Sequence, residues 1–457
     1  MHRTDFYSSL VLKSGSASFS DNAFLKCTAI LMAPPADNKT MTVSFAGNST
    51  ISNGYVYGQT IIGDSHGRSV FNWNSSASAQ IRTVYVGFNR GYGELDVNKG
   101  FMSAGERYGL FIGKAWKNPD NKEMLRNWGG NAINDPAQFA PTGVVRVAGG
   151  VLRVDPIYAA GSYTVGKRLP GLVVGEGALD YDEYSGRPCY GLLEISGGSV
   201  TNLRGNVVVG YGHAVGRIVQ TGGEFVKSYG TTQATVIGLA GGDGALVVSN
   251  GVHASDKTPV FVGGASFADL GTIMTSGNYP KGVRNAKGVL TLACHDKTKA
   301  CTFKVTNVPA ASGSGVWVGR DGDGTIEIIG SGSTLDVQNT GLTLTNGFTV
   351  ANGETETPGE LLTHGQATLR FVFDADGVGQ IDSRNKPVAI APNAKLEVDM
   401  SAYSGIPRKV LLLRCQSRDN SFAPENMTLK NCTIVQDEDA NIYAKYKSER
   451  HFAIIFR

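Results

Sequence analysis

The chain has 457 residues, of which 18% are charged, and its formal net charge is +3 at pH 7. Lysine and arginine are scattered and form no basic block, so the charge balance argues against a nucleic-acid partner or an anionic membrane surface. The apolar runs at residues 29–33 and 410–413 are too short to span a bilayer, and we expect no membrane span. Sixty glycines and the lack of a long stretch with helical periodicity argue against a mainly helical protein.

Residues 1–55 contain short strand-like pieces at 9–13 and 41–45, separated by Gly, Ser, Asn and the adjacent Pro34 and Pro35. These pieces are typical of an N-terminal cap or of degenerate first rungs, and a cap protects the open edge of a repeat array. Residues 1–15 lack the apolar core of a secretory signal. We therefore expect a trimmed fragment, or export through another signal.

A repeated unit of strand, turn, strand, turn and strand fills residues 56–352, and its clearest copy is VWVGRDGDGTIEIIGSGSTLDV at 316–337. Three apolar β-formers lead into a glycine, and an alternating strand follows, with Val, Ile and Leu expected inside and Thr, Arg, Glu and Gln outside. Such self-similarity predicts an all-β fold, a single-stranded parallel β-helix or β-solenoid, and we expect its coil to be right-handed. The lead glycines are Gly63, Gly87, Gly113, Gly175, Gly210, Gly238, Gly263 and Gly319.

Two steps between lead glycines, from Gly113 to Gly175 and from Gly263 to Gly319, are about twice as long as most others. Each is either one rung with an insertion or two rungs, of which one has lost its signature. Inserted loops are expected near 116–141 and 267–286. Loops that leave one face of a solenoid are often where binding occurs.

The candidate binding residues lie in the first insertion and in the loop between Gly175 and Gly191. The aromatic candidates could stack on sugar rings, and packing of the loops onto the solenoid explains them equally well. The acidic candidates could bind calcium or take part in acid–base cleavage of a polysaccharide beside a basic residue, and solvated loop charges are the alternative. The candidates are Trp116, Trp128, Asp180, Tyr181, Asp182, Glu183, Tyr184 and Arg187.

Three other patterns favour structure over chemistry. The segment GDSHG at 63–67 has the shape of a nucleophile elbow, but a strand follows where that motif needs a helix. The acidic pairs at 321–323 and 374–376 lack the run of oxygen ligands that calcium needs, so we expect no cofactor, with calcium as the alternative. His213, His253 and His295 fall in different rungs, which predicts isolated surface imidazoles and no metal site.

After residue 352 the repeat signature ends, and residues 353–457 are predicted to form a terminal β segment that caps the stack. Cys294 and Cys301 flank a polar loop between apolar arms, which predicts a hairpin closed by a disulfide, and Cys415 and Cys432 form a second candidate pair. Two bridges suit an oxidising compartment, whereas buried free thiols are the alternative. The spacing is not that of a Cys-x-x-Cys zinc site.

Two segments, WVGRDGDGTIEIIGSGS and VVVGYGHAVGRIVQTGG, carry a resemblance to a known family. Their pattern resembles the repeat of type V secretion (autotransporter) passengers and PEP-CTERM-associated bacterial surface proteins. Residues 367–405 are similar to the segment that follows such repeats in large exported proteins. The resemblance implies an exported β-helix located outside the cell or on the bacterial surface, and it brings no catalytic residues with it.

The function expected from these observations is that of a structural or adhesive surface protein. Its β-solenoid stalk would present loops to glycans or to other surface proteins. The alternative is a polysaccharide lyase or glycoside hydrolase, in which acids and a basic residue from adjacent rungs converge on one groove. The sequence contains no converging catalytic set, so a non-enzymatic role is expected and the enzymatic one stays open. The ligand, the oligomeric state and the route of anchoring are also left open.

Overall fold

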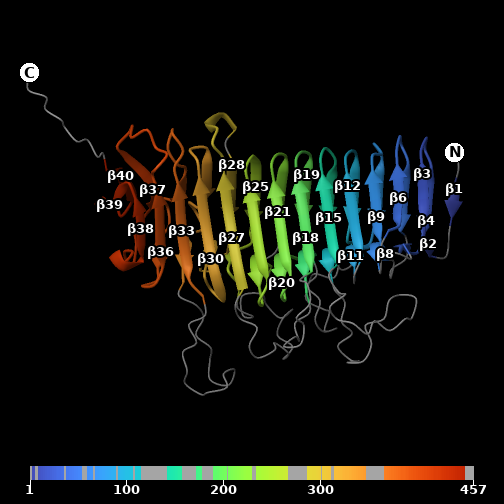
Figure 1. Ribbon diagram of the computed structural model, residues 1–457, viewed down its shortest axis with the longest axis horizontal. Helices are drawn as coiled ribbons and strands as arrows, with labels where there is room; N and C mark the ends of the chain where they lie inside the picture. Colours follow the sequence, from blue (N-terminus) through green and yellow to red (C-terminus); the bar gives the residue numbers. More distant parts are fainter. Residues whose placement is uncertain are drawn as a thin grey trace, which may run out of the picture.

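The computed structural model describes residues 3–5, 9–34, 38–53, 59–64, 67–88, 91–106, 109–114, 141–156, 171–177, 189–202, 204–228, 233–265, 286–299, 301–309, 313–345 and 365–447. Within these ranges the chain is an elongated stack of short β-strands, with its first and last strands at opposite ends (Figure 1). Every third strand belongs to the same sheet, and equivalent strands of consecutive rungs pair in parallel. The fold is therefore the parallel β-helix that the repeats predicted, and the hand of its coil stays a prediction.

Each rung visits three sheets, which we call A, B and C in the order in which the chain enters them. Sheet A contains β1 (Arg3–Asp5), β4 (Phe24–Cys27), β7 (Thr50–Asn53), β10 (Ser78–Ile81), β13 (Phe101–Ala104), β16 (Val151–Val154), β19 (Ser199–Asn202), β22 (Glu224–Ser228), β25 (Gly251–Asp256), β28 (Cys301–Thr306), β31 (Ser333–Asp336), β34 (Gln380–Ser383), β37 (Lys409–Cys415), β40 (Ile442–Tyr446) and β39 (Cys432–Gln436). Sheet B contains β2 (Leu10–Leu12), β5 (Ile30–Met32), β8 (Gln59–Asp64), β11 (Thr83–Phe88), β14 (Gly109–Lys114), β17 (Gly171–Glu176), β20 (Asn206–Tyr211), β23 (Thr235–Leu239), β26 (Val260–Val262), β29 (Val316–Val318), β32 (Leu342–Leu344) and β35 (Val388–Ile390). Sheet C contains β3 (Gly15–Phe19), β6 (Thr40–Phe45), β9 (Arg68–Trp73), β12 (Tyr92–Val97), β15 (Thr142–Val147), β18 (Tyr190–Ile195), β21 (Val215–Gln220), β24 (Asp243–Val248), β27 (Ala286–Ala293), β30 (Gly322–Ile329), β33 (Ala367–Val372), β36 (Lys395–Asp399) and β38 (Met427–Lys430). Two 3₁₀ turns, η4 (Lys297–Lys299) and η6 (Pro424–Asn426), lie between strands.

Sheets A and C have one buried and one solvated face, whereas the middle strands of sheet B are buried on both faces. In β18 and β21 of sheet C, buried residues alternate with partly exposed ones, as expected for a half-buried strand. In β11, β14, β17 and β20 of sheet B every residue is buried. A strand buried on both faces needs a continuous apolar run. This explains why the unit begins with three consecutive apolar residues before its lead glycine.

The long steps between lead glycines are single rungs with insertions. β14 pairs directly with β17, and β26 pairs directly with β29, so no rung is missing between them. Both insertions leave the stack where the chain passes from sheet B to sheet C. The connections β17–β18 and β32–β33 depart from the same corner. The inserted residues themselves, 115–140 and 266–285, lie outside the described residues.

The solenoid extends on both sides of residues 56–352. Strands β1 to β7 already form regular rungs. β1 pairs with β4, β2 with β5, β3 with β6 and β4 with β7. At the other end, β33, β34 and β35 continue the three sheets without a break. Among the described strands, only β39 and β40 depart from this pattern, because they form an antiparallel hairpin that pairs with the last parallel strand of sheet A, β37. This hairpin covers that end of sheet A.

Two residues that we expected on the surface lie inside the stack. His253 is 1% exposed, and its ring stacks between Phe225 and Phe303, at centroid distances of 4.2 and 4.6 Å. The three residues occupy the same position in consecutive strands of sheet A. Gln220 is fully buried, and its side-chain oxygen is 3.2 Å from Nδ1 of His253. The expectation of a surface imidazole was wrong for His253, because in-register stacking places a flat ring in the same layer as its aromatic neighbours.

The four cysteines proposed as disulfide partners are buried free thiols in the structure. Cys301 begins β28 of sheet A, whereas Cys294 follows β27 of sheet C, so the two arms occupy neighbouring sheets of one rung and do not form a hairpin. Each arm pairs instead with equivalent strands of the adjacent rungs. Burial raises the pKa of Cys301 and of Cys432 to about 11, which keeps both thiols protonated at neutral pH. Cys415 donates to the carbonyl oxygen of Ala440 at 3.4 Å.

Candidate functional site

The eight binding candidates predicted from the sequence lie outside the described residues. Trp116 and Trp128 belong to the insertion at 115–140, and the other six belong to 178–188. Both segments start from the same corner of the stack, between sheets B and C. The structure therefore tests neither their mutual positions nor their chemistry. The candidate site that the structure does define lies on a different sheet.

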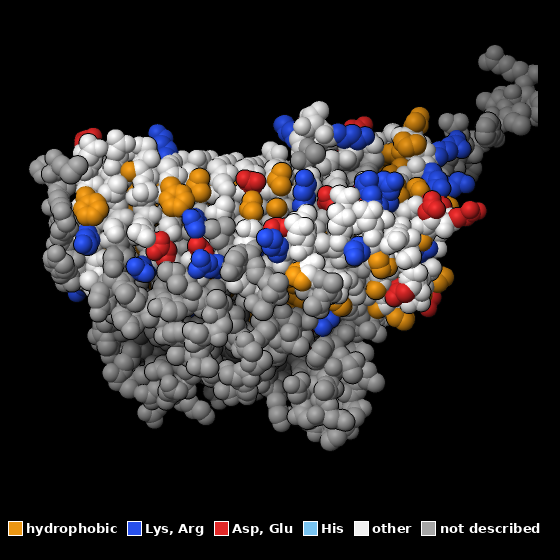
Figure 2. All heavy atoms as spheres, turned by 180° about the vertical axis from the view of Figure 1, so that it is seen from behind, with side chains coloured by type: hydrophobic (Ala, Val, Ile, Leu, Met, Phe, Trp, Pro, Cys, Tyr) orange, Lys and Arg blue, Asp and Glu red, His pale blue; other side chains and the backbone are white. Residues whose placement is uncertain are grey.

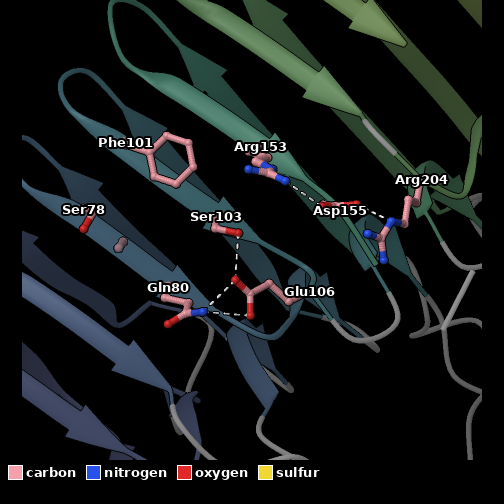
Figure 3. Close-up of a pocket in the computed structure, with 9 residues that line it drawn as sticks. Ser78, Gln80, Phe101, Ser103, Glu106, Arg153, Asp155 and Arg204 are labelled. Carbon is pink, nitrogen blue, oxygen red and sulfur yellow. Dashed lines mark hydrogen bonds and ion pairs between the residues drawn. The ribbon is translucent and has the colours of Figure 1, made fainter. Parts of the chain in front are cut away.

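A pocket of about 450 Å³ opens on the outer face of sheet A, where the strands β10, β13 and β16 lie side by side (Figure 3). This volume lies in the range that accommodates a small ligand. Most of its lining side chains alternate with buried residues of the same strands and so point away from the core. Four successive rungs contribute the lining residues, which are Ser78, Ala79, Gln80, Phe101, Ser103, Glu106, Arg153, Asp155 and Arg204.

Neutral groups hold the carboxylate of Glu106 in one half of the pocket. Gln80 donates from Nε2 to Oε1 and Oε2 of Glu106 at 2.9 and 3.1 Å, and the Ser103 hydroxyl donates to Oε1 at 3.1 Å. Gln80 and Ser103 are register partners on β10 and β13, so the rigid sheet fixes both donors. Glu106 consequently presents a fixed acceptor toward solvent. In Figure 3 the two donors converge on it from the strands.

The other half of the pocket contains a carboxylate between two arginines. Arg153 donates from Nη2 to Oδ2 of Asp155 at 2.7 Å, and Nε of Arg204 lies 3.3 Å from Oδ1 of Asp155. The side chain of Asp155 is 14% exposed, whereas each arginine side chain is 41% exposed. Arg153 follows Ser103 in register. The arginines can therefore keep their contact with Asp155 and still offer outward N–H groups to a ligand.

The composition of the pocket suits a hydroxylated ligand. Phe101 supplies an apolar ring beside Ser78, its register partner on β10. Amide, hydroxyl, carboxylate and guanidinium groups surround this ring, and such a set can match the donors and acceptors of several hydroxyl groups. The sequence could not indicate this grouping, because the members are far apart in the chain and come together only through the register of the rungs. The usable signal was the outward position of Gln80, Ser103 and Arg153 in three short alternating strands.

The outer face of sheet C also contains charged residues, but they pair with each other. Arg146 lies 3.4 Å from Glu94, 3.4 Å from Asp96 and 2.9 Å from Glu194, so one guanidinium joins the carboxylates of the two rungs on either side of its own. A second ladder places Arg370 between Glu327, at 2.9 Å, and Glu397, at 3.7 Å. On the face shown in Figure 2, basic and acidic side chains are likewise interspersed along the stack. These ladders neutralise the charges of neighbouring rungs and leave no single-sign surface there.

The environment moves the pKa values of the Arg146 cluster in opposite directions. Burial would raise the pKa of Glu94, but hydrogen bonds from Arg68 and Tyr92 outweigh it and lower this pKa. For Asp96 burial dominates and raises the pKa, despite the charge of Arg146. Glu94 is therefore held as a carboxylate. The opposite shifts reflect how well each carboxylate is hydrogen-bonded.

The acidic pairs and the GDSHG segment have structural roles where the structure describes them. The segment after GDSHG is strand β9, as expected for a repeat loop. Asp374 accepts hydrogen bonds from the backbone N–H groups of Ser331, Asp376 and Gly377 at 2.9 Å each, which organises a turn. Within the described ranges, no group of three or more His, Cys, Asp or Glu side chains is arranged to hold a metal ion.

Comparisons of the chain with protein-family models, with curated proteins and with solved structures give no match. No α-helix that could cross a bilayer occurs among the described residues. The architecture and the pocket are therefore the observations on which a function can be argued.

Proposed function

We propose that this protein is an exported structural or adhesive protein of the bacterial surface, whose β-solenoid is a stalk that binds glycans on its side. The pocket on sheet A carries this proposal, because it combines an aromatic ring with hydrogen-bonding groups that rigid strands fix in place. The resemblance of the repeats to those of type V secretion passengers and PEP-CTERM-associated proteins agrees with a location outside the cell. The self-compensating charge ladders suit a long, soluble stalk.

The proposed ligand is a mono- or disaccharide unit of a surface glycan. One sugar ring would lie over the apolar face of Phe101. Glu106 would accept hydrogen bonds from two neighbouring hydroxyl groups, and Arg153 would donate to ring or hydroxyl oxygens. Gln80 and Ser103 prevent Glu106 from turning away, since they occupy its oxygens from the strand side. A preorganised site loses little conformational entropy when the sugar binds.

The alternative function, a polysaccharide lyase or glycoside hydrolase, has one observation in its favour. Glu106 and Asp155 lie on the same face as two arginines, which is the combination that such an enzyme would need. Hydrolysis, however, requires one carboxyl group that is protonated and one that is a base or nucleophile. Asp155 is engaged in ion pairs with Arg153 at 2.7 Å and Arg204 at 3.3 Å, so its carboxylate is directed at these two side chains rather than at a substrate. Binding without cleavage is therefore the function that the geometry supports better.

A glycan array tests the proposal, followed by an assay of each hit for new reducing or unsaturated ends. We expect binding without cleavage, and we expect Phe101→Ala and Glu106→Gln each to weaken it by about tenfold or more. Glu224→Gln is the matched control, because Glu224 is an exposed acid further along the same face of sheet A. Binding that survives both pocket variants would move the site to the segments of Trp116 and Tyr181. Cleavage of a hit would replace the adhesive function with the enzymatic one.

A further inference from the structure

The interior of the stack contains an unusual polar group at the corner between sheets A and B. Asn202 and Lys227 are both fully buried, at 0% exposure, and Gln233 is 3% exposed. Most other residues of the interior are apolar. A buried amine and a buried amide in such surroundings lower the stability of the fold unless they are hydrogen-bonded or have a chemical role.

Asn202 and Lys227 are direct neighbours across two rungs. They are register partners at the ends of β19 and β22, and parallel partners with the same inward orientation lie about 4.8 Å apart along the stack. The Lys227 amine donates to Oε1 of Gln233 at 3.2 Å, which positions Nζ near the sheet corner. The amide of Asn202, by contrast, has no hydrogen-bond partner for either Oδ1 or Nδ2 among the described residues.

The environment also prepares the amine to react. Burial lowers the pKa of Lys227 to about 7, and the negative charge of Asp155 acts against this change. A substantial fraction of the amine is therefore neutral, and so nucleophilic, near pH 7. The buried interior keeps water away from the amide, so hydrolysis does not compete.

We propose that Lys227 and Asn202 form an intramolecular isopeptide bond that joins β22 to β19. Nζ of Lys227 attacks Cγ of Asn202, and a new N–C bond forms. The Cγ–Nδ2 bond breaks, one proton passes from Nζ to Nδ2, and ammonia leaves. The step needs no oxidant, reductant or cofactor. It replaces an ionisable amine and an unpaired primary amide with one neutral secondary amide, which removes two unfavourable buried groups.

Gln233 is a second amide near the amine among the described residues, and the geometry favours Asn202 over it. Lys227 approaches Gln233 as a hydrogen-bond donor toward the carbonyl oxygen, which directs N–H rather than the nitrogen lone pair at that group. This contact satisfies Gln233, whereas the amide of Asn202 gains a partner only by reacting. Gln233 therefore orients the amine, and Asn202 accepts it.

Mass spectrometry of the purified full chain tests this proposal. We expect the intact mass to be lower than the sequence mass by one ammonia. Trypsin should release a branched product in which the peptide that ends at Arg204 is joined to a peptide that contains an uncleaved Lys227. A link to Gln233 would instead stay within the Lys227 peptide and would overturn the assignment. Separate, unmodified peptides for Asn202 and Lys227 would overturn the proposal entirely.

Two variants serve as controls. Lys227→Met keeps the length of the side chain without the amine, and Asn202→Leu keeps the volume of the acceptor without the amide nitrogen. We expect both chains to have their full sequence masses and no branched peptide. Because either variant could fail to fold, circular dichroism of each chain is recorded first. Lys297→Met, in the exposed turn η4, is the matched control and should keep the ammonia loss.

Discussion

His253 shows how the position in a rung, rather than the residue type, decides what a side chain does. Burial lowers its pKa to about 3, whereas an imidazole in an unfolded chain titrates near pH 6.5. Below about pH 6.5 the unfolded chain therefore binds a proton that the folded chain does not bind. The ring is held neutral between Phe225 and Phe303, with Gln220 as its polar partner.

This burial predicts a specific loss of stability in mild acid. The contribution of His253 is complete above about pH 6.5 and falls by up to ~1.4 kcal/mol per pH unit as the pH decreases toward 3. Urea unfolding at about pH 7.5 and about pH 5 should show a loss that is about 2 kcal/mol smaller in His253→Phe than in the wild type. The exposed His213, replaced by Asn, is the control. An equal loss in wild type and His253→Phe would contradict the prediction.

At the scale of the strand, ion pairs differ according to the sheet that carries them. Lys114 and Glu176 are register partners on β14 and β17 of sheet B, and each side chain is only 9% exposed. Lys114 also lies over the ring of Phe111, with Nζ 4.3 Å from its centroid. Arg146 of sheet C is 40% exposed, and water screens its contacts. Breaking the first pair leaves a buried charge. Breaking the second leaves Asp96 and Glu194 partly in contact with water, and Glu94 keeps its ion pair with Arg68.

We therefore expect Lys114→Met to lower the free energy of unfolding by about 3 kcal/mol or more, because Glu176 would stay buried without its cation. Adding Glu176→Leu should restore most of this loss, since the pair is then replaced by packed apolar groups. Arg146→Met should cost about 1 kcal/mol or less and should matter less at high salt. Urea titrations of the four chains measure these differences. A large effect of Arg146→Met would show that the exposed ladder stabilises far more than its exposure indicates.

The strands could be predicted where the sequence repeats a pattern, whereas the pocket on sheet A could not be predicted. The apolar triplet before each lead glycine and the alternation after it indicate strand, turn and strand, because glycine is needed where the chain turns the corner. At Gly210, for example, φ is 73° and a Cβ would lie 2.4 Å from the carbonyl oxygen of Asp243. The Cys294–Cys301 hairpin was wrong because local sequence does not distinguish antiparallel arms from two strands of one rung.

The pocket depends on the register between β10, β13 and β16, which cannot be read from the sequence. Gln80, Ser103 and Arg153 lie in one row, but rungs of unequal length separate them in the chain. The lead glycines lie in or next to the strands of sheet B. Aligning the rungs on these glycines therefore does not align the residues of sheet A. The buried Asn202 and Lys227 were missed for the same reason, since each looks like an ordinary surface residue until its strand is placed.

On the scale of the whole molecule, the two ends of sheet A differ in strand pairing, because the sheet begins with β1 parallel to β4. Sheet A ends in the antiparallel hairpin of β39 and β40, which hydrogen-bonds to β37. Without it, β37 would present an open parallel edge that continues the register of the stack, and such edges promote association between chains. With it, the antiparallel strand β39 is the outermost strand of sheet A. The hairpin is therefore expected to keep stalks apart at this end.

Ala444→Pro tests the role of the hairpin. Ala444 is buried and pairs with both Val410 and Ile434, so a proline there removes a ladder hydrogen bond from the middle strand. We expect larger species in light scattering after size exclusion, relative to the unmodified chain. Glu438→Pro is the matched control, because Glu438 is exposed at the second position of the turn, where proline is favoured. Equal masses for all three chains would refute a protective role of the hairpin.

The parallel pairing of each rung with the rung before it has a consequence for how the protein is made. Val207 pairs with Thr235, and Val260 pairs with Val316, so each strand docks on chain that precedes it by about one rung. A newly emerging segment therefore finds its template already folded, and the stack can grow in the direction in which the chain leaves a ribosome or a secretion pore. Each rung that folds outside the pore also prevents the chain from sliding back through it. Folding can therefore make secretion of the chain unidirectional.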